Sequence, residues 1–420
     1  MSILTAPENY ELINTCNKCG FCQANCSVYK EVLNEAYATR GRLRLIKAVA
    51  DGQLERTPLY EKIINSCLMC EECSKNCPSG VQGHLLIQLA RQDLVMKKGL
   101  SLIKKIPIGT VLPNNRLRKL SFNSARLLKK IIDPLPSLQS YRGIDLKSIP
   151  IADEDFLSGY QPEEVGLGKK GSLKIGFFVG CLMNHTMPQV AKSIVRLLAA
   201  HDCEVVVPAE QRCCGTPAYT YGHSAISEEV ALSNINLFNS LGVDKIVTGC
   251  ASCGKMLKYY SRIFEKNAEI EEAANDFAGR VLDLSQLLID VLKIDLQKFA
   301  LPLKGKITYH DPCHLVRGQD ISSQPRQIIS GVFGEQFVEM PTANKCCGAA
   351  GMFQGFYPEE ATAITNKKVA SIQKSGADYV VTGCPACLLR IQGSLRLNNM
   401  PQKVVHLAQL LDPDSAANIV

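Results

Sequence analysis

The 420-residue sequence contains no tryptophan, and aromatic residues make up only 6% of it. It also has no nucleic-acid-binding motif, hydrolase triad or zinc-protease motif, so we expect no nucleic acid partner and no hydrolytic activity of those kinds. No apolar run approaches the ~20 residues that a membrane-spanning helix needs, which argues against an integral membrane protein. Met1 to Thr15 has neither a basic start nor an apolar stretch. We therefore expect no secretory signal and a cytoplasmic location.

Cysteine, by contrast, is abundant, with 19 residues in the chain. In a reducing compartment, clustered cysteines are metal ligands or redox groups more often than disulfides, and an odd number leaves at least one unpaired. The length and the 46% apolar content suffice for two or three domains with cores of their own.

Two cysteine runs lie near the N-terminus, Cys16-x2-Cys19-x2-Cys22-x3-Cys26 and Cys67-x2-Cys70-x2-Cys73-x3-Cys77-Pro78. This is the spacing of two-cluster bacterial ferredoxins, in which the fourth cysteine of each run binds the neighbouring cluster. The spacing predicts two [4Fe–4S] cubane clusters, one held by Cys16, Cys19, Cys22 and Cys77 and the other by Cys67, Cys70, Cys73 and Cys26. Zinc also binds four thiolates, but structural zinc typically takes two ligands from each of two knuckles.

The insertion between the runs, Ser27 to Ser66, is longer than in a minimal ferredoxin, and Arg42 to Asp51 has a helical pattern. These features predict a helical, ferredoxin-like two-cluster domain over residues 1–96.

The C-terminal part of the sequence is an internal repeat. Cys181 and Cys213 are 32 positions apart, and Cys313 and Cys346 are 33 apart. The flanking text agrees, since Val243-Asp-Lys-Ile-Val-Thr-Gly-Cys250 resembles Ala377-Asp-Tyr-Val-Val-Thr-Gly-Cys384. We interpret this as a duplication, with one half at 171–300 and the other at 301–420.

Short β-branched runs alternate with helical stretches in both halves. Strands are expected at 174–180, 204–207, 245–248, 306–313 and 378–382, and helices at 189–200 and 359–375. This alternation predicts α/β units with a mainly parallel sheet, and it places the cysteines at strand ends, where ligand sites form.

Each half carries a lone cysteine, a Cys-Cys-Gly triplet and a Cys-x-x-Cys pair. The first set is Cys181, Cys213, Cys214, Cys250 and Cys253, and the second is Cys313, Cys346, Cys347, Cys384 and Cys387. Adjacent cysteines suit a bridging role, with one thiolate shared between irons, although a zinc site or a structural site without a cluster stays open. Cys203 has no counterpart and is assigned to packing. His310 and His314 either donate hydrogen bonds to cluster sulfurs or act as structural caps.

A basic connector is predicted at 97–170. Residues 97–148 hold twelve Lys and Arg against two acidic residues, together with several Leu and Ile. Such a segment either forms a solvated connector or lies against an acidic partner or an anionic membrane, giving peripheral contact with its inner face.

The two Cys-Cys-Gly halves resemble the cysteine-rich (CCG) domains of heterodisulfide reductase and of the iron–sulfur subunits of glycolate oxidase, D-lactate dehydrogenase and anaerobic glycerol-3-phosphate dehydrogenase. Gly41-Arg-Leu-Arg-Leu-Ile-Lys-Ala-Val49 and Cys77-Pro-Ser-Gly-Val81 are most similar to the glycolate oxidase subunit. The resemblance covers nearly the whole chain except the connector.

This resemblance implies an electron-transfer subunit that receives electrons from a FAD-containing subunit oxidising a 2-hydroxy acid, and passes them to quinone or another carrier. It also implies one or two noncubane [4Fe–4S] clusters on the ten CCG cysteines. Both Cys-x-x-Cys pairs are complete here, unlike in some glycolate oxidase subunits. The alternative is therefore a catalytic subunit that reduces a disulfide at such a cluster, as in heterodisulfide reductase.

Overall fold

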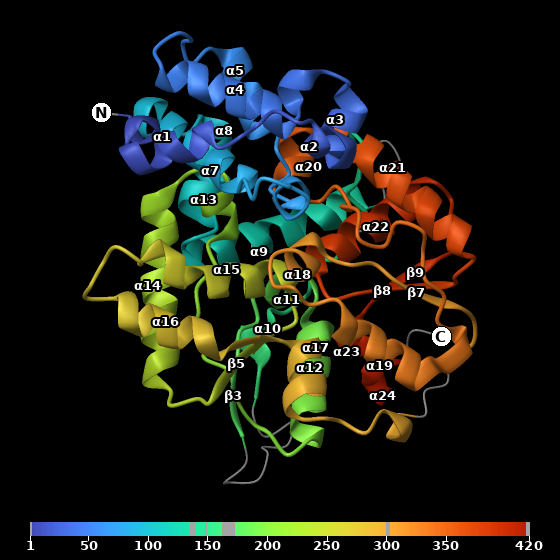
Figure 1. Cartoon of the computed structure of the whole chain (residues 1–420). Helices are drawn as coiled ribbons and strands as arrows, with labels where there is room; N and C mark the ends of the chain where they lie inside the picture. Colours follow the sequence, from blue (N-terminus) through green and yellow to red (C-terminus); the bar gives the residue numbers. More distant parts are fainter. Residues whose placement is uncertain (1, 134–139, 148, 162–172, 300–302, 417–420) are drawn as a thin grey trace.

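The computed structural model describes residues 2–133, 140–147, 149–161, 173–299 and 303–416. A helical N-terminal part lies above two α/β halves that sit side by side (Figure 1). The predicted connector falls partly outside the described residues, at 134–139, 148 and 162–170.

The N-terminal part consists of short helices, and no strand occurs among the described residues from 2 to 98. Apolar side chains three residues apart, at Leu43, Ile46 and Val49, bury one face of α4, which confirms the helix expected there. The helices are η1 (Ile3–Thr5), α1 (Pro7–Asn14), α2 (Phe21–Asn25), α3 (Ser27–Val32), η2 (Glu35–Tyr37), α4 (Thr39–Ala50), α5 (Pro58–Asn65), α6 (Glu72–Lys75) and α7 (Gly83–Lys98).

The basic connector is partly folded against the two halves. Asn114 caps α9, and Arg118 on this helix is buried, with its Nε donating to His185 Nε2 at 3.1 Å. Phe122 stacks on the same histidine. The described elements are α8 (Leu102–Lys104), η3 (Lys105–Val111), α9 (Asn115–Ile132), β1 (Ser140–Tyr141), β2 (Ile144–Asp145) and α10 (Phe156–Gly159).

The first half contains a four-stranded parallel sheet with the order β4-β3-β5-β6. Its strands are β3 (Lys174–Phe177), β4 (Glu204–Val206), β5 (Lys245–Thr248) and β6 (Val281–Asp283). Its helices are α11 (Cys181–Thr186), α12 (Pro188–Ala200), α13 (Thr216–Thr220), α14 (Ser224–Ser240), α15 (Ala251–Ile263), α16 (Glu271–Arg280), α17 (Leu284–Gln286), η6 (Leu287–Val291) and η7 (Leu296–Lys298).

The second half repeats this topology with the parallel order β7-β8-β9. A single parallel bridge from Ile307 to Phe337 takes the place of the missing edge strand. The strands are β7 (Ile307–Tyr309), β8 (Tyr379–Thr382) and β9 (Lys403–His406). The helices are α18 (Cys313–Val316), α19 (Ser323–Phe333), η8 (Gly334–Gln336), α20 (Phe353–Phe356), α21 (Pro358–Ser375), α22 (Pro385–Leu397), α23 (Leu407–Leu411) and α24 (Pro413–Ala416).

Equivalent contacts confirm the duplication. The Lys174 N–H donates to the Asp244 carboxylate at 2.8 Å, and the Lys306 N–H donates to Asp378 at the same distance. The two halves also share one continuous apolar core, which runs from Ile175 to Leu411. The two halves are therefore packed against each other as one unit.

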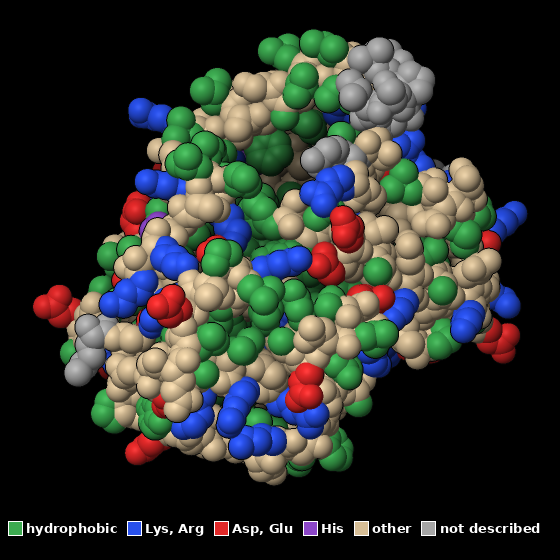
Figure 2. Space-filling model, turned by 90° about the horizontal axis from the view of Figure 1, so that it is seen from above, with side chains coloured by type: hydrophobic (Ala, Val, Ile, Leu, Met, Phe, Trp, Pro, Cys, Tyr) green, Lys and Arg blue, Asp and Glu red, His purple; other side chains and the backbone are tan. Residues whose placement is uncertain are grey.

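Seen from above, the surface carries lysine and arginine side chains interspersed with hydrophobic ones around a hollow (Figure 2). Among the described residues, no helix combines the length and the apolar character needed to cross a bilayer.

Candidate functional site

The two N-terminal cysteine runs have the same backbone conformation. Lys18 and Met69, each two residues after the first cysteine of its run, have positive φ angles of 62° and 55°. Gly20 and Glu71, two residues further on, also have positive φ. Non-glycine residues adopt this conformation rarely, so the surrounding structure must hold both loops in place.

Three cysteines of the first run and two of the second line one small cavity of about 30 Å³. Its cysteines are Cys16, Cys19, Cys22, Cys73 and Cys77. The four residues predicted to bind the first cubane cluster thus lie together, although Cys77 is far from the other three in sequence. Cys19 is exposed, so this cysteine group reaches the molecular surface.

Three cysteines of the second predicted set lie close together, because the thiol of Cys73 interacts with those of Cys67 and Cys26. The fourth, Cys70, interacts instead with Cys313 and Cys346 of the second half. The Tyr29 N–H donates to Cys26 Sγ at 3.5 Å, and the Met69 N–H donates to Cys67 Sγ at 3.4 Å. Backbone N–H groups aimed at sulfur stabilise the thiolate form, which is the form that binds iron.

Two buried arginines that the sequence analysis missed support the second run. Arg42 donates to the Ile63 carbonyl at 2.9 Å, and Arg91 donates to the Cys67 carbonyl at 2.7 Å. Both side chains are about 1% exposed. The burial of Arg42 could have been predicted from the sequence, because this residue lies on the apolar face of α4 with Ile46 and Val49.

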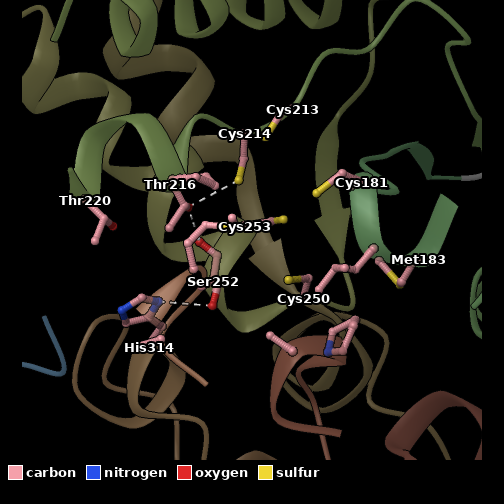
Figure 3. A pocket seen from close by; sticks show the side chains of 18 of the residues that line it. Cys181, Met183, Cys213, Cys214, Thr216, Thr220, Cys250, Ser252, Cys253 and His314 are labelled. Carbon is pink, nitrogen blue, oxygen red and sulfur yellow. Dashed lines mark hydrogen bonds between the residues drawn. The ribbon is translucent and has the colours of Figure 1, made fainter. Parts of the chain in front are cut away.

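The five cysteines of the first half converge at the C-terminal ends of its strands. Cys181 follows β3, Cys250 follows β5, Cys253 lies in the first turn of α15, and Gly215 after the Cys213-Cys214 pair has a φ of 85°. Figure 3 shows these thiols directed toward a common space. The cavity there has a volume of about 90 Å³ and extends past the cysteines to Tyr221 and Met352.

The second half brings its five cysteines together in the same way. Cys313 follows β7 and begins α18, Cys384 follows β8, and Gly348 after the Cys346-Cys347 pair has a φ of 86°. Cys347 Sγ and Cys387 Sγ are 3.1 Å apart. A nitrogen of His310 and these two sulfurs lie within 4.8 Å of one another.

Thiol contacts shift the pKa values of these buried cysteines in opposite directions. The pKa of Cys213 is well below its usual value because the thiols of Cys181 and Cys214 donate to it. The pKa of Cys347 is also well below its usual value, because of its contacts with the thiols of Cys346 and Cys387. Thiol contacts and burial raise the pKa of Cys253. Five thiolates in one half, four of them buried, cannot coexist without positive charge, so these donor sets suit a bound metal centre that displaces the protons.

The four cysteine groups adjoin one another through named contacts. Cys70 of the second N-terminal group lies near Cys313 and Cys346, and Arg317 Nε donates to the Cys70 carbonyl at 2.7 Å. The thiols of Cys250 and Cys384 interact across the two halves. Cys70 thus connects the second N-terminal group with the second half, and the contact of Cys250 with Cys384 connects the second half with the first. Leu68, next to Cys67, also lines the cavity of the first half, so the N-terminal part adjoins both halves.

His314 stands at the junction of three parts. Its Nδ1 lies 3.1 Å from Ser252 Oγ of the first half, and its Nε2 lies 3.3 Å from the Met69 carbonyl of the N-terminal part. Burial lowers its pKa to about 4, so the ring is neutral near pH 7. Cys203, by contrast, is buried in the apolar core directly before β4, at the end of the sheet opposite to the other cysteines of its half, as expected for a packing residue.

Comparisons with known proteins agree with this arrangement. Residues 175–258 and 307–392 match the CCG family, described as "Cysteine-rich domain", and residues 12–81 match a "4Fe-4S dicluster domain". The chain is 31% identical to the probable glycolate oxidase iron-sulfur subunit of Bacillus subtilis, over 96% of this chain and 93% of that protein.

Two further relatives carry other names. One is a subunit of the CoM/CoB fumarate reductase of Methanothermobacter marburgensis, 30% identical over 97% of this chain and 74% of that protein. Lactate utilization protein A of Geobacillus kaustophilus is 33% identical over 57% of this chain and 99% of that protein.

Proposed function

Because this chain belongs to the family of iron–sulfur proteins that join a 4Fe-4S dicluster domain to two cysteine-rich CCG domains, we propose that it carries electrons within a flavin-dependent 2-hydroxy-acid dehydrogenase complex. A FAD-containing subunit would oxidise glycolate, lactate or a similar acid. This chain would pass the electrons to quinone or another carrier. The names of the relatives from Bacillus and Geobacillus, which refer to glycolate oxidase and lactate utilization, support this context.

The observation that carries the proposal is the contiguity of the four cysteine groups. Flavins release electrons in pairs or singly, and iron–sulfur clusters take them one at a time, so a row of clusters suits this conversion. The proposed ligands are Cys16, Cys19, Cys22 and Cys77 for one cubane cluster, and Cys67, Cys70, Cys73 and Cys26 for the other, in a helical two-cluster domain. Each CCG set of five cysteines would hold one noncubane [4Fe–4S] cluster.

The protein contributes positive charge and backbone donors to these centres. The guanidinium of Arg317 lies beside Cys70 and Cys313, and Arg118 lies near Cys181 and Cys213. Clusters bound by thiolates are anionic, and cations and N–H donors nearby stabilise the added electron. The exposed Cys19 marks the end of the row at which a partner can approach.

A second function is favoured by the cavity beside the first CCG group. The space extends from its cysteines to Leu68, Tyr221 and Met352, so a small apolar molecule could reach the sulfur ligands. This supports the alternative in which the CCG centres themselves reduce a disulfide substrate. Quinone or another small carrier would fit the same description, so the two functions are separated by assay.

The test is anaerobic isolation with partners retained. The electron-transfer proposal expects a FAD-containing subunit to co-purify, and expects the iron–sulfur centres to bleach on addition of glycolate or lactate only when that subunit is present. If the purified chain alone instead reduces a heterodisulfide with a reduced viologen as donor, the catalytic alternative replaces it.

Peripheral membrane contact through the connector is also proposed. Four apolar side chains on α9 are more than half exposed, and basic residues of the same helix lie exposed among them. The apolar residues are Leu120, Leu127, Leu128 and Ile131, and the basic ones are Arg116, Lys119 and Lys130. This composition suits the surface of an anionic membrane and would bring the row of clusters near a quinone pool.

A further inference from the structure

The two CCG halves place different side chains at equivalent positions around their cysteines. The residue 16 positions before Cys250 is Asn234, whereas the residue 16 positions before Cys384 is Lys368. The residue three positions after Cys253 is Met256, whereas the residue three positions after Cys387 is Arg390. The second half therefore carries two cations where the first carries neutral side chains.

Lys368 is buried inside the second half, and burial lowers its pKa to about 8, so the side chain is mostly protonated near pH 7. It lies on α21 with its side chain buried, and its charge interacts with the sulfurs of Cys347 and Cys346. Its Nζ contacts the Thr342 carbonyl, the Ala343 carbonyl at 3.1 Å and Met340 Sδ at 3.9 Å. Three acceptors match the three N–H donors of a charged lysine.

Arg390 lies on the next helix, α22, and its charge interacts with Cys347. Its guanidinium donates to Thr365 Oγ1 at 2.7 Å, to the Gly143 carbonyl at 3.0 Å and to Thr362 Oγ1 at 3.2 Å. Thr365 Oγ1 in turn donates to the Cys347 carbonyl at 2.8 Å. Within the described part of the chain, no carboxylate lies within ion-pair distance of Lys368 or Arg390. The cysteines are the nearest strong influence on the charge of Lys368, and Asp311 acts on it more weakly.

The first half carries uncharged side chains at the same positions. Asn234 donates to the Cys213 carbonyl at 3.3 Å and to the Tyr260 hydroxyl at 3.2 Å, which are ordinary packing contacts. Met256 is buried in the apolar core. The remaining cations nearly balance between the halves, because Arg118 faces Cys181 and Cys213 while Arg317 faces Cys313 and Cys346.

Nearby acids do not cancel this difference. Asp311 precedes Cys313 by two residues, but Arg326 Nη1 and Nη2 bind its two oxygens at 2.8 and 2.7 Å. Asp283 interacts with Cys384 from the first half, and burial raises its pKa to about 6. Asp283 therefore contributes at most one negative charge, against the two positive charges of Lys368 and Arg390.

A third difference between the halves also gives the second half a polar group that the first half lacks. His310, three residues before Cys313, takes the place of Phe178, three residues before Cys181. Both ring nitrogens of His310 are buried, and neither has a hydrogen-bond partner among the described residues. With the sulfurs of Cys347 and Cys387 close by, an N–H of this ring is available to a sulfur of a bound centre.

We propose that Lys368, Arg390 and His310 give the iron–sulfur centre of the second half a higher reduction potential than the centre of the first half. This inference rests on the proposed function, in so far as both halves hold such centres. Reduction adds negative charge, and buried cations without carboxylate partners favour it. The second half contacts the N-terminal part through Cys70 and the first half through Cys384, so an electron that arrives from either part would collect there.

The experiment is a redox titration of the anaerobically isolated full chain followed by EPR. Signals are assigned with Cys214→Ser and Cys347→Ser, each of which removes a ligand from one half. We expect the second-half centre to be reduced first, and Lys368→Asn and Arg390→Met each to shift its potential downward while the first-half centre stays in place. Lys367→Asn is the matched control, because this neighbouring lysine is exposed and pairs with Glu31. His310→Phe, which copies Phe178, is a second variant that keeps the cations.

The possible results distinguish a failure of this inference from a failure of the proposed function. Equal potentials in the two halves, or potentials unmoved by all three substitutions with iron retained, would overturn the inference and leave the proposed function intact. Absence of iron from both halves of the unmodified chain would overturn both.

Discussion

The Ala251 N–H donates to the Gly383 carbonyl at 3.1 Å, directly across the boundary between the two halves. Ala251 follows Cys250 and Gly383 precedes Cys384, so this bond joins the two Cys-x-x-Cys loops. His406 Nε2 reaches the Gly249 carbonyl at 2.7 Å beside it. The two halves therefore meet at these loops, where the thiols of Cys250 and Cys384 come into contact.

Cys26 is predicted to bind the cluster of the second N-terminal run. Cys26→Ser should remove or destabilise that cluster, lowering the iron content by up to about four atoms per chain. The measurement is iron analysis of anaerobically purified protein together with its visible absorbance. Cys203→Ser is the control, since Cys203 is buried directly before β4 and belongs to none of the predicted ligand sets. A Cys26→Ser chain with unchanged iron and spectrum would contradict the crossed ligand assignment.

Arg317 fastens the N-terminal part to the second half. It is 7% exposed and binds the Cys70 carbonyl at 2.7 Å, the Asn344 carbonyl at 2.8 Å and Glu72 at 2.8 Å. Arg317→Met should lower the unfolding free energy by about 3 kcal/mol, because Glu72 keeps only part of its compensation. Anaerobic urea unfolding measures this change.

The control for Arg317 is Lys75, which forms an ion pair across the same interface but at the protein surface. Lys75 pairs with Asp320 at 2.6 Å, but both side chains are largely exposed. Lys75→Met should therefore cost less than about 1 kcal/mol. Equal losses for the two variants would show that Arg317 acts only as a surface charge.

Asp283 gives the protein a defined pH dependence. Burial raises the pKa of this carboxyl from 3.8 to about 6, so the folded state holds the proton more tightly than the unfolded state. Stability from this group is present below pH 3.8 and is lost as pH rises through about 6. Asp283→Asn cannot ionise and should be more stable than the native chain by about 3 kcal/mol at pH 7.5 and by about 2 kcal/mol at pH 5.5.

Unfolding free energies at the two pH values test this prediction. Asp295→Asn is matched to it, because Asp295 caps a helix in the same way but is exposed. A gain for Asp283→Asn that does not shrink toward pH 5.5 would show that the carboxyl does not titrate in this window.

The exposed apolar residues of α9 are predicted to bind anionic lipid. The native chain should sediment with vesicles rich in anionic lipid at low salt, and less so with neutral vesicles or at high salt. Leu127→Ser combined with Ile131→Ser should reduce the bound fraction several-fold, whereas Leu33→Ser, on an exposed leucine of the N-terminal part, should not. If the native protein stays in the supernatant with anionic vesicles at low salt, α9 does not bind the membrane.

Much of the fold follows from local sequence patterns. The strands at 174–177, 245–248 and 379–382 and the helices α12 and α21 lie where β-branched runs and helical periodicity predict them. The count of positions between cysteines predicts the duplication, and the sheets with their shared order confirm it. The ferredoxin spacing predicts which cysteines come together, because thiolates at fixed short intervals can reach one cluster only in certain combinations.

Long-range packing could not be predicted in this way. Nothing near Cys70 in the sequence indicates that Arg317 will lie beside it, and nothing near Cys250 indicates the contact with Cys384. Arg118 belongs to the basic connector, yet it is buried beside His185 and close to Cys181. Such contacts depend on how preformed units pack, which no periodicity within one unit records.

Iron analysis with EPR on the anaerobically isolated chain decides whether all four cysteine groups hold iron–sulfur centres. We expect about 16 iron atoms per chain, from four centres of four irons each. About eight irons, confined to the N-terminal groups, would contradict it for both CCG halves. A colourless, iron-free protein that remains folded and active would contradict it altogether.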